Sequence, residues 1–474
     1  MLYILIAIVL FLAVLMARAL AFKHAAEAPR DTSPVAVDAD RAAEHLAEMI
    51  RCKTVSYQDK ALEDSTQFDK FEALLPKLYP TLHERAEFLK LGPRSLLFRI
   101  PGREAGDPTI LMAHYDVVPA NEDAWEKPPF AGILEAGVLW GRGTLDTKGT
   151  LCSILEAAED LLTEGFVPRA DLYLAFSGEE ETGNAGCITI VDYFADRGIV
   201  PAMVLDEGGA VVEGVFPGVS APAALIGTGE KGMMNVRLVL DTNGGHASTP
   251  PPHSPVGRLA RAVANIENHP FPFELSRPAA ELFDTLGRHS TFLYRLIFAN
   301  LWCFKPVLNL ICKSGGGELN ALVRTTVAFT RMEGSAAFNV LPPHAWVGAN
   351  LRLNGSETVE SARARLEKLA ADPDIRLEVE GTNPSRISVT RGEGWDCLKS
   401  AIVSTWSDTI VSPYLMLACS DSRHYGRISD KVYRFSAMAL SKAERAMIHG
   451  NNERIPVATL KTTVEFYKRL ITIR

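Results

Sequence analysis

Short apolar runs that alternate with helix-like segments are the feature that most restricts the fold of this chain. Residues 109–113 (TILMA), 171–176 (DLYLAF) and 202–205 (AMVL) have the length and side chains of buried strands. Between the first two runs, an amphipathic helical pattern begins after Gly149 and extends to residue 162. Strands that alternate with helices at this spacing predict an α/β fold with a mostly parallel sheet.

A second pattern interrupts the first. Residues 233–240 and 346–353 alternate between apolar and polar, as strands of a half-exposed sheet do. Because 474 residues are too many for one hydrophobic core, we expect a smaller α+β domain inserted into the catalytic domain as a lid or dimerisation unit. The expected parts are the two segments of the catalytic domain, residues 42–229 and 385–474, and the inserted domain, residues 230–384.

The N-terminal 22 residues form a separate segment. Residues 2–16 are an unbroken run of 15 apolar residues, and Arg18 is the only charge between residues 2 and 22. At about 1.5 Å per residue, a helix of this length spans the ~30 Å hydrocarbon core of a bilayer. We expect residues 1–22 to be a retained single-pass membrane anchor, followed by a linker at residues 23–41. A cleaved signal peptide of a secreted protein and a buried helix are the alternatives.

Charge and cysteine spacing exclude other classes of partner and site. The net charge is -8 and no basic stripe is present, which argues against a nucleic-acid partner. The seven cysteines are scattered without a CxxC pair, so neither a disulfide framework nor a cysteine zinc site is expected. The apolar segment 291–311 is interrupted by Arg295, Lys305 and Pro306. This favours a packed helical excursion of the inserted domain over a second membrane contact.

Acidic and imidazole side chains follow directly after the predicted strands. His114 and Asp116 follow the first strand, a run of three glutamates (179–181) follows the second, and Asp206 follows the third. Alternate residues at a strand end point to the same side, so Asp116 can accept the second ring N–H of a metal-binding His114. Because ligands bind beyond the carboxyl ends of parallel strands, we expect these side chains to converge.

Two further segments complete the candidate set. Asp146 lies in the glycine-rich sequence GRGTLDTKG, and His449 lies in HGNNER. A glycine-rich turn before a helix can bind phosphate, but this spacing matches neither a Walker A loop nor a dinucleotide motif. Two histidines and three carboxylates instead suit two metal ions that share one carboxylate. A further carboxylate that binds no metal can act as the general base.

The order of these motifs resembles that of the di-zinc metallopeptidases and aminoacylases typified by carboxypeptidase S. The resemblance extends from about residue 45 to residue 470, and is greatest to the membrane-anchored or secreted carboxypeptidase S-like enzymes, including N-acyl-amino-acid synthases/hydrolases. The motifs that carry it are His114-Tyr-Asp116, Asp146-Thr-Lys-Gly149, Glu179-Glu-Glu181, Asp206, Gly244-Gly-His-Ala-Ser248, Asn339-Val-Leu-Pro342, Asp421-Ser-Arg-His-Tyr425 and His449-Gly-Asn-Asn-Glu-Arg454.

The resemblance implies a metal-binding role for five residues. His114 and Asp206 would hold one divalent ion, and Glu181 and His449 would hold the other. Asp146 would bridge the two ions, which are expected to be Zn2+.

The resemblance also implies the residues that act on the substrate. Glu180 would be the general base, and Asp116 would orient His114. The run of three glutamates can also be aligned with the family motif one residue earlier, with Glu179 as the general base and Glu180 as the metal ligand. Alignment of Gly183 with the glycine of the family motif favours Glu180 as the base and Glu181 as the ligand.

In the inserted domain, the resemblance implies that His246 stabilises the oxyanion, in relatives often across a dimer. Asn339, Arg352 and Arg423 would bind the substrate. A guanidinium can hold a terminal carboxylate through two parallel hydrogen bonds. A surface ion pair is the alternative for Arg352 and Arg423.

The implied activity is hydrolysis of an amide bond next to a free α-carboxylate, with release of a C-terminal amino acid from a peptide. An aminoacylase or N-acyl-amino-acid hydrolase is the alternative, and a catalytically dead, membrane-tethered binding protein is a more distant one. No Gly-x-Ser-x-Gly elbow supports a serine hydrolase. The expected partners are a peptide or N-acyl-amino-acid substrate, a membrane through the N-terminal segment, and a second copy through the inserted domain.

Overall fold

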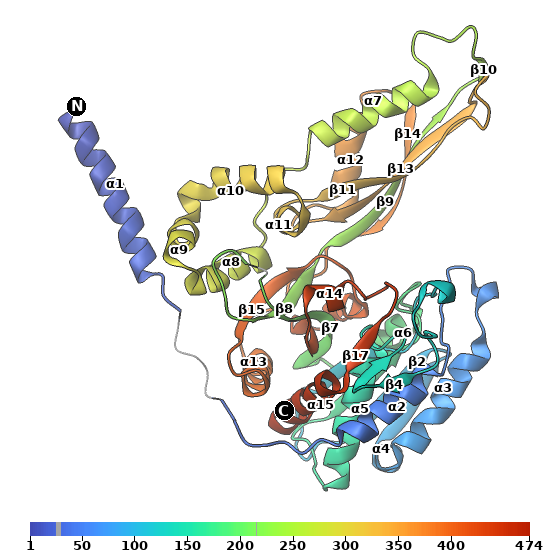
Figure 1. Cartoon of the computed structure of the whole chain (residues 1–474), viewed down its shortest axis with the longest axis vertical. Helices are drawn as coiled ribbons and strands as arrows, with labels where there is room; N and C mark the ends of the chain where they lie inside the picture. Colours follow the sequence, from blue (N-terminus) through green and yellow to red (C-terminus); the bar gives the residue numbers. More distant parts are fainter. Residues whose placement is uncertain (25–29, 215) are drawn as a thin grey trace.

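The computed structural model describes residues 1–24, 30–214 and 216–474, so residues 25–29 of the expected linker lie outside the described residues. Figure 1 shows a body built on a large sheet and a narrow arm built on a second sheet. The helix α1 (Leu2–Ala21) projects away from the body and stands apart from the sheet of the arm (Figure 1).

The large sheet has eight strands in the order β1-β2-β6-β3-β7-β16-β8-β15. β6, β3, β7 and β16 run parallel to one another, and β15 runs parallel to β8. β1 and β2 form an antiparallel hairpin at one edge. This parallel centre confirms the α/β prediction. In sheet order, the strands span Glu87–Gly92, Ser95–Ile100, Leu172–Ser177, Thr109–His114, Met203–Val212, Val432–Ala439, Ala223–Glu230 and Ile410–Met416.

Both faces of the central strands are buried, which explains their unbroken apolar sequences. In β3, Leu111 and Ala113 belong to one apolar cluster, and Ile110 and Met112 belong to another on the opposite face. The second cluster includes side chains of α6 (Ala185–Asp196). The helices that contribute to the first are α2 (Ala39–Ile50), α3 (Ser65–Leu78), α4 (Pro80–Arg85), α5 (Lys148–Thr163), α13 (Glu393–Thr405) and α15 (Val457–Ile473).

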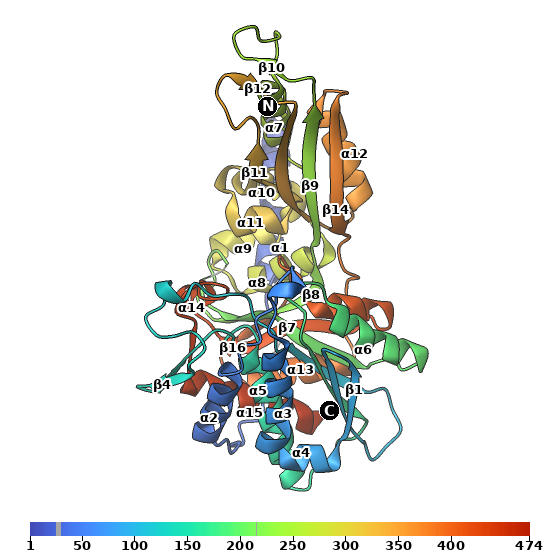
Figure 2. The same cartoon turned by 90° about the vertical axis from the view of Figure 1, so that its right-hand side faces the viewer.

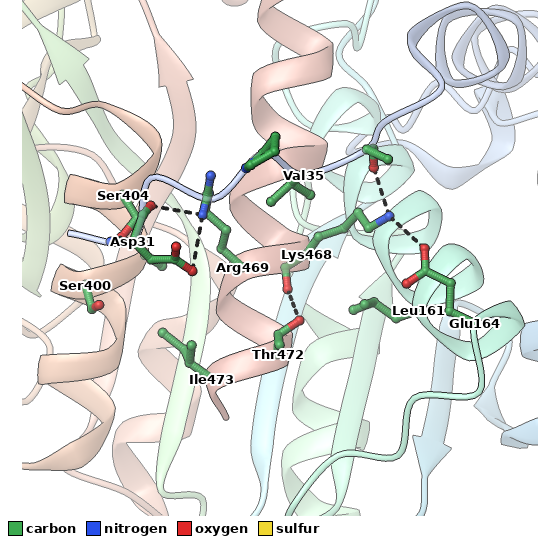
Figure 3. A pocket seen from close by; sticks show the side chains of 13 residues that line it. Asp31, Val35, Leu161, Glu164, Ser400, Ser404, Lys468, Arg469, Thr472 and Ile473 are labelled. Atoms are coloured by element: carbon green, nitrogen blue, oxygen red, sulfur yellow. Dashed lines mark hydrogen bonds and ion pairs between the residues drawn. The ribbon is translucent and has the colours of Figure 1, made fainter.

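The described part of the linker lies along α15 (Figure 3). Lys468 Nζ donates a hydrogen bond to the carbonyl of Ala36 (2.9 Å). Arg469 donates to the carbonyls of Asp31 (3.1 Å) and Ser33 (2.7 Å). These contacts fix this part of the linker to the body.

The arm contains an antiparallel sheet in the order β11-β13-β9-β14 (Figure 2). α7 (Pro255–Asn268) and α12 (Val359–Ala370) pack against one face of it through a cluster that includes Leu238 and Leu351. This is the α+β unit that the second sequence pattern predicted. A two-stranded ribbon, β10 (Gly245–His246) and β12 (Val340–Leu341), lies at the far tip of the arm (Figure 1). The sheet strands span Thr326–Glu333, His344–Leu353, Gly232–Asp241 and Ile375–Thr382.

Between α7 and β11 the chain forms a series of helices, residues 277–322, which we call the helical excursion. Phe283 and Leu415 belong to a separate apolar cluster that packs the excursion against the edge of the large sheet. Segment 291–311 is helical as predicted, and its inner side packs against the body. The prediction of a packed excursion holds only in part, because the outer sides of two of its helices are exposed. The helices are α8 (Arg277–His289), α9 (Phe292–Phe298), α10 (Leu301–Gly315) and α11 (Gly317–Leu322).

A small sheet brings two distant motifs together. β17 (Arg454–Pro456) pairs with β5 (Val138–Trp140), which also pairs with β4 (Ile133–Glu135). The segment between α14 (Lys442–Arg445) and β17 therefore lies beside the loop that precedes α5. This pairing places His449 near Asp146.

Candidate metal centre

Two imidazoles face the two oxygens of one carboxylate at the carboxyl edge of the large sheet. His114 Nε2 lies 3.1 Å from Asp146 Oδ1, and His449 Nε2 lies 2.9 Å from Asp146 Oδ2. Glu181 Oε1 lies 3.1 Å from His449 Nε2. Ligand atoms of Asp146, Glu181 and His449 are thus close enough together to hold one ion. The geometry places Asp146 between two candidate ion positions, as a bridging ligand requires.

Asp116 connects the histidine to the glutamate run. Its carboxylate lies 3.3 Å from His114 Nδ1 and accepts a hydrogen bond from the Ser56 hydroxyl at 2.6 Å. It also accepts the backbone N–H groups of Glu180 and Glu181, each at 3.2 Å. Burial alone would raise the pKa of Asp116, but hydrogen bonding and charge attraction from His114 hold it below its ordinary value. Asp116 therefore stays ionised and fixes both the imidazole ring and the loop.

Asp206 and Glu207 lie in the middle of β7 and not after a strand as predicted, and their carboxylates point to different partners. Glu207 Oε1 lies 3.4 Å from His114 Nε2, and Glu207 forms a candidate ion site with His114 and Asp146. Asp206 Oδ2 instead accepts the backbone N–H of Ser422 at 3.0 Å. Among the described residues, Asp206 belongs to none of the candidate ion sites, so its role as a ligand stays a prediction. Glu207 was not among the predicted metal ligands, although it directly follows Asp206 in the sequence.

Glu180 lies beside His114 and Glu181, and its carboxylate forms no hydrogen bond or ion pair with another of the described residues. Burial raises the pKa of Glu180 well above its ordinary value, against the attraction of His114, and the nearby Glu207 raises it further. Its ligand atoms also come close to those of His114 and Glu181. A raised pKa makes the ionised carboxylate a stronger proton acceptor, which suits a general base.

A buried ion pair supports the loop that carries Asp146. Glu453 Oε2 lies 2.7 Å from Arg142 Nη1. Glu453 Oε1 accepts the backbone N–H groups of Gly143 (3.0 Å) and Leu145 (2.8 Å). The sequence motif HGNNER contains Glu453, but its role became visible only when the two segments were brought together.

An apolar cavity of about 360 Å³ opens beside these residues. Asp146, Glu180, Glu207 and His449 line one side of it. The remaining wall is mainly apolar and includes Val212, Leu225, Tyr414, Met416, Leu440 and Ile448. An apolar group attached to the reacting bond can therefore lie next to the candidate ion sites.

Residues 110–473 match the family model described as peptidase family M20/M25/M40. The chain belongs to this family. The N-fatty-acyl-amino acid synthase/hydrolase PM20D1.1 of Danio rerio is 35% identical over 431 residues, which cover 89% of this chain and 83% of that protein. The probable carboxypeptidase S-like 2 of Dictyostelium discoideum is 34% identical over 438 residues, which cover 90% and 84% of the two chains.

Solved structures show the same fold. The M20 family metallo-carboxypeptidase Sso-CP2 from Sulfolobus solfataricus superposes with a TM-score of 0.64 at 18% identity, covering 91% of this chain and 98% of that one. Human carnosine dipeptidase 1 gives a TM-score of 0.63 at 15% identity, covering 92% and 96%. Membership of the M20 family confirms the predicted enzyme class, a metal-dependent hydrolase of the metallopeptidase and aminoacylase type.

The two arginines expected to bind substrate in this M20 enzyme lie where the arm joins the body. Arg352 Nη1 donates to Cys419 Sγ at 3.7 Å, and Cys419 lines the cavity. Arg423 Nη2 donates to the carbonyl of Asn383 at 2.6 Å, and its Nη1 lies 3.9 Å from buried Glu230. Arg352 is thus the arginine that reaches the cavity lining, whereas Arg423 is engaged by protein groups.

His246 and Asn339 lie together at the tip of the arm, far from the metal centre of the same chain (Figure 1). The backbone N–H of Ala247 donates to the carbonyl of Asn339 at 3.0 Å, and His246 pairs with Val340 across the ribbon. His246 Nδ1 lies 2.7 Å from the Ser248 hydroxyl. The structure therefore does not bring His246 to the centre of its own chain.

Proposed function

We propose that this M20 enzyme hydrolyses the amide bond next to a free α-carboxylate and releases the C-terminal amino acid of a peptide. One observation carries the proposal: Asp146 faces His114 and His449 with separate oxygens, at the mouth of a cavity with an apolar wall. The arrangement of the two histidines around Asp146 suits a hydrolase with two metal ions. The cavity can hold the acyl group of the substrate, on one side of the bond that is cut.

The donor set suits zinc. Imidazole nitrogens and carboxylate oxygens are ordinary Zn2+ ligands, and no cysteine lines the centre at ligand distance among the described residues. We propose that Glu181 and His449 hold one ion, and that Asp146 is shared. His114 and Glu207 hold the other, in place of the Asp206 expected from the resemblance. When bound, the ions would supply Lewis acidity to the scissile carbonyl and to the attacking water.

The chain itself handles the proton and the substrate. Glu180 accepts a proton from the attacking water and delivers it to the leaving amine. Asp116 keeps His114 in one orientation through its Nδ1. Arg352, which reaches the cavity lining, is placed to bind the free carboxylate of the substrate, and Arg423 is placed to support that position.

The arm would contribute residues to the active site of a second copy of the chain. We propose that residues 230–384 form an inserted domain through which two copies associate, while residues 42–229 and 385–474 form the catalytic domain. Since His246 and Asn339 lie at the far tip of the arm, they would act on the centre of a partner copy. His246 would then donate a hydrogen bond to the oxyanion, an interaction typically worth about 3 kcal/mol of barrier.

N-acyl amino acids are a second candidate substrate class. The apolar wall of the cavity favours an acyl group without hydrogen-bonding atoms over a peptide backbone. The name of the Danio rerio relative, an N-fatty-acyl-amino acid synthase/hydrolase, points in the same direction. The scissile bond and the free carboxylate are the same in both classes, so the metal centre serves either.

A hydrolysis panel tests these assignments. The purified chain is supplied with N-blocked dipeptides and with long-chain N-acyl amino acids, with and without a chelator. We expect amino acid release that the chelator abolishes and that Zn2+ restores. No release from any substrate, together with less than one bound ion per chain in zinc-supplemented protein, would instead support a binding protein without activity.

We also propose that α1 is a retained membrane anchor and not a cleaved signal. It has 20 residues and a mean hydropathy of 2.8, and is the only described helix that could by itself cross a membrane. Arg18 donates to the carbonyl of Ala299 and to Asn300 Oδ1, and Asn300 Nδ2 donates to the carbonyl of Leu15. Cleavage would leave the buried Asn300 without these partners. N-terminal sequencing of membrane-extracted protein that begins after residue 22 would contradict the proposal.

A further inference from the structure

The outer sides of α9 and α10 carry large apolar side chains that nothing in the described structure covers. Leu293 is 68% exposed, Trp302 59% and Leu310 67%. Phe292, Val307 and Ile311 are also exposed on the same two helices. We call these six residues the apolar face. Several large apolar side chains exposed on two neighbouring helices indicate a surface that is covered by a partner or by lipid.

The apolar face lies beside the second half of α1. The rings of Phe11 and Trp302 meet edge to face at 6.0 Å between centroids. Leu15 and Ala19 are the only buried residues of α1, and the Arg18–Asn300 hydrogen bond lies between them. α9 and α10 therefore accompany α1 from about its midpoint to its C-terminal end.

The contact between Phe11 and Trp302 determines how deep Trp302 would lie in a bilayer that α1 crosses. From Phe11 to Ala21, α1 rises about 15 Å at ~1.5 Å per residue. This length is about half of the ~30 Å hydrocarbon core of a bilayer. If α1 crosses the membrane, Trp302 beside Phe11 must lie at acyl-chain depth within one leaflet.

The charges around the apolar face favour an anionic membrane surface. Residues 1–24 and 285–317 contain six lysines and arginines and no aspartate or glutamate, although the whole chain has a net charge of -8. Lys23 follows α1, and Lys305 and Lys313 lie on α10. Basic side chains next to an inserted helix are attracted to anionic headgroups.

We propose that α9 and α10 are immersed in one leaflet beside α1, so that the apolar face is a lipid-binding surface. Both segments are helical, so most of their backbone groups are paired internally and can enter the acyl region. The pair is bent by 105° at a short break, which suits helices that enter and leave the same leaflet. The inference rests on the proposed anchor and does not depend on the proposed catalysis.

The cavity beside the metal centre lies next to the apolar cluster that packs under the helical excursion. Leu225 and Tyr414 line the cavity and also pack against the apolar cluster beneath the helical excursion. Phe298 of α9 and Leu308 of α10 belong to that cluster. The immersed helices would therefore hold the cavity close to the membrane surface.

Fluorescence quenching by lipid tests the proposal on the full chain. Trp302 is the only tryptophan among the large exposed apolar residues that the structure describes. The chain is reconstituted into vesicles of equal parts phosphatidylcholine and phosphatidylglycerol whose acyl chains carry bromine. We expect quenching of a tryptophan component that the Trp302→Phe variant lacks. Equal quenching in the two proteins would overturn the proposal.

Charged variants separate lipid contact from other occupants of the face. Leu310→Asp with Ile311→Asp should remove the quenchable component, whereas Val200→Asp, on an exposed apolar residue of the body, should leave it unchanged. Absence of quenching together with cross-linked pairs through α10 would show that a second copy covers the face instead. Quenching requires no turnover, and a chain that does not sediment with vesicles would contradict the anchor. Far-ultraviolet circular dichroism and thermal unfolding check that each variant is folded.

Discussion

The carboxylate of Glu453 lies 2.7 Å from the guanidinium of Arg142, and both side chains are buried. The pair joins the segment before β17 to the loop that carries Asp146, and the same carboxylate accepts three backbone N–H groups of that loop, including that of Asp146. Asp146 and His449 lie on the two segments that this ion pair holds together. The position of Asp146 relative to His449 therefore depends on Glu453, which belongs to none of the candidate ion sites of the described residues.

The Glu453→Gln variant should lower both stability and metal retention. It leaves the Arg142 guanidinium buried without a countercharge, a change that costs about 3–5 kcal/mol in typical buried pairs. Urea unfolding and metal analysis measure the two effects. The matched control is Glu393→Gln, which breaks the half-exposed pair with Arg169 and should cost about 0–1 kcal/mol. Equal small effects of both variants would show that the pair does not support the loop.

The Glu180→Gln variant should lower kcat by at least about a hundredfold while both ions stay bound, because the amide cannot accept the proton of the attacking water. Glu179→Gln is the control, since Glu179 lies near Lys60 at 3.4 Å and belongs to none of the candidate ion sites of the described residues. If Glu179→Gln were inactive and Glu180→Gln active, Glu179 would be the general base, as in the alternative alignment of the three glutamates.

Two isosteric variants distinguish the neighbouring carboxylates in the middle of β7. Glu207→Gln should lose one of the two ions at a chelator concentration at which the unaltered enzyme keeps both. Asp206→Asn should retain both ions, because the carboxamide oxygen can still accept the N–H of Ser422. Metal analysis after dialysis measures the result. The reverse pattern would restore Asp206 as the ligand.

The width of the cavity should select the acyl group. Ala418 is exposed and lines the cavity, so Ala418→Trp narrows it without disturbing the core. We expect kcat/KM for long-chain N-acyl amino acids to fall at least about tenfold, while that for short acyl groups stays unchanged. Ala443→Trp, on an exposed position of α14 outside the lining, is the control. A uniform loss for all acyl lengths would contradict the assignment of the cavity to the acyl group.

Lys231, between the two sheets, should give the folded state a pH-dependent stability. Burial lowers the pKa of Lys231 to about 7 from an ordinary 10.5. Between these values the unfolded chain binds a proton that the folded chain has released, so the free energy of unfolding rises with pH. The Lys231→Met variant should show a smaller rise than the unaltered chain between pH values of about 7 and about 10 in urea unfolding. Parallel curves for the two proteins would show that Lys231 stays charged when folded.

Local patterns determined the elements of this fold. Residues 109–113 form a strand buried on both sides, and the apolar sequence already shows this because each face of β3 meets its own cluster. The helical character of segment 291–311 was also readable, since apolar spacing is a local property. The direction in which α9 and α10 expose that apolar surface was not, because it depends on the contact between Trp302 and Phe11, nearly three hundred residues apart.

By itself, the sequence determined that His114 and Glu181 follow predicted strands, and the order of its motifs added Asp146 and His449 to the candidate metal ligands. Only the tertiary structure decided that Glu207 is presented to His114, that Glu453 supports the Asp146 loop, and that His246 lies far from the centre of its own chain. The physical reason is that a strand end fixes which edge of the sheet a residue reaches. The partner of each side chain depends on segments that meet only after folding.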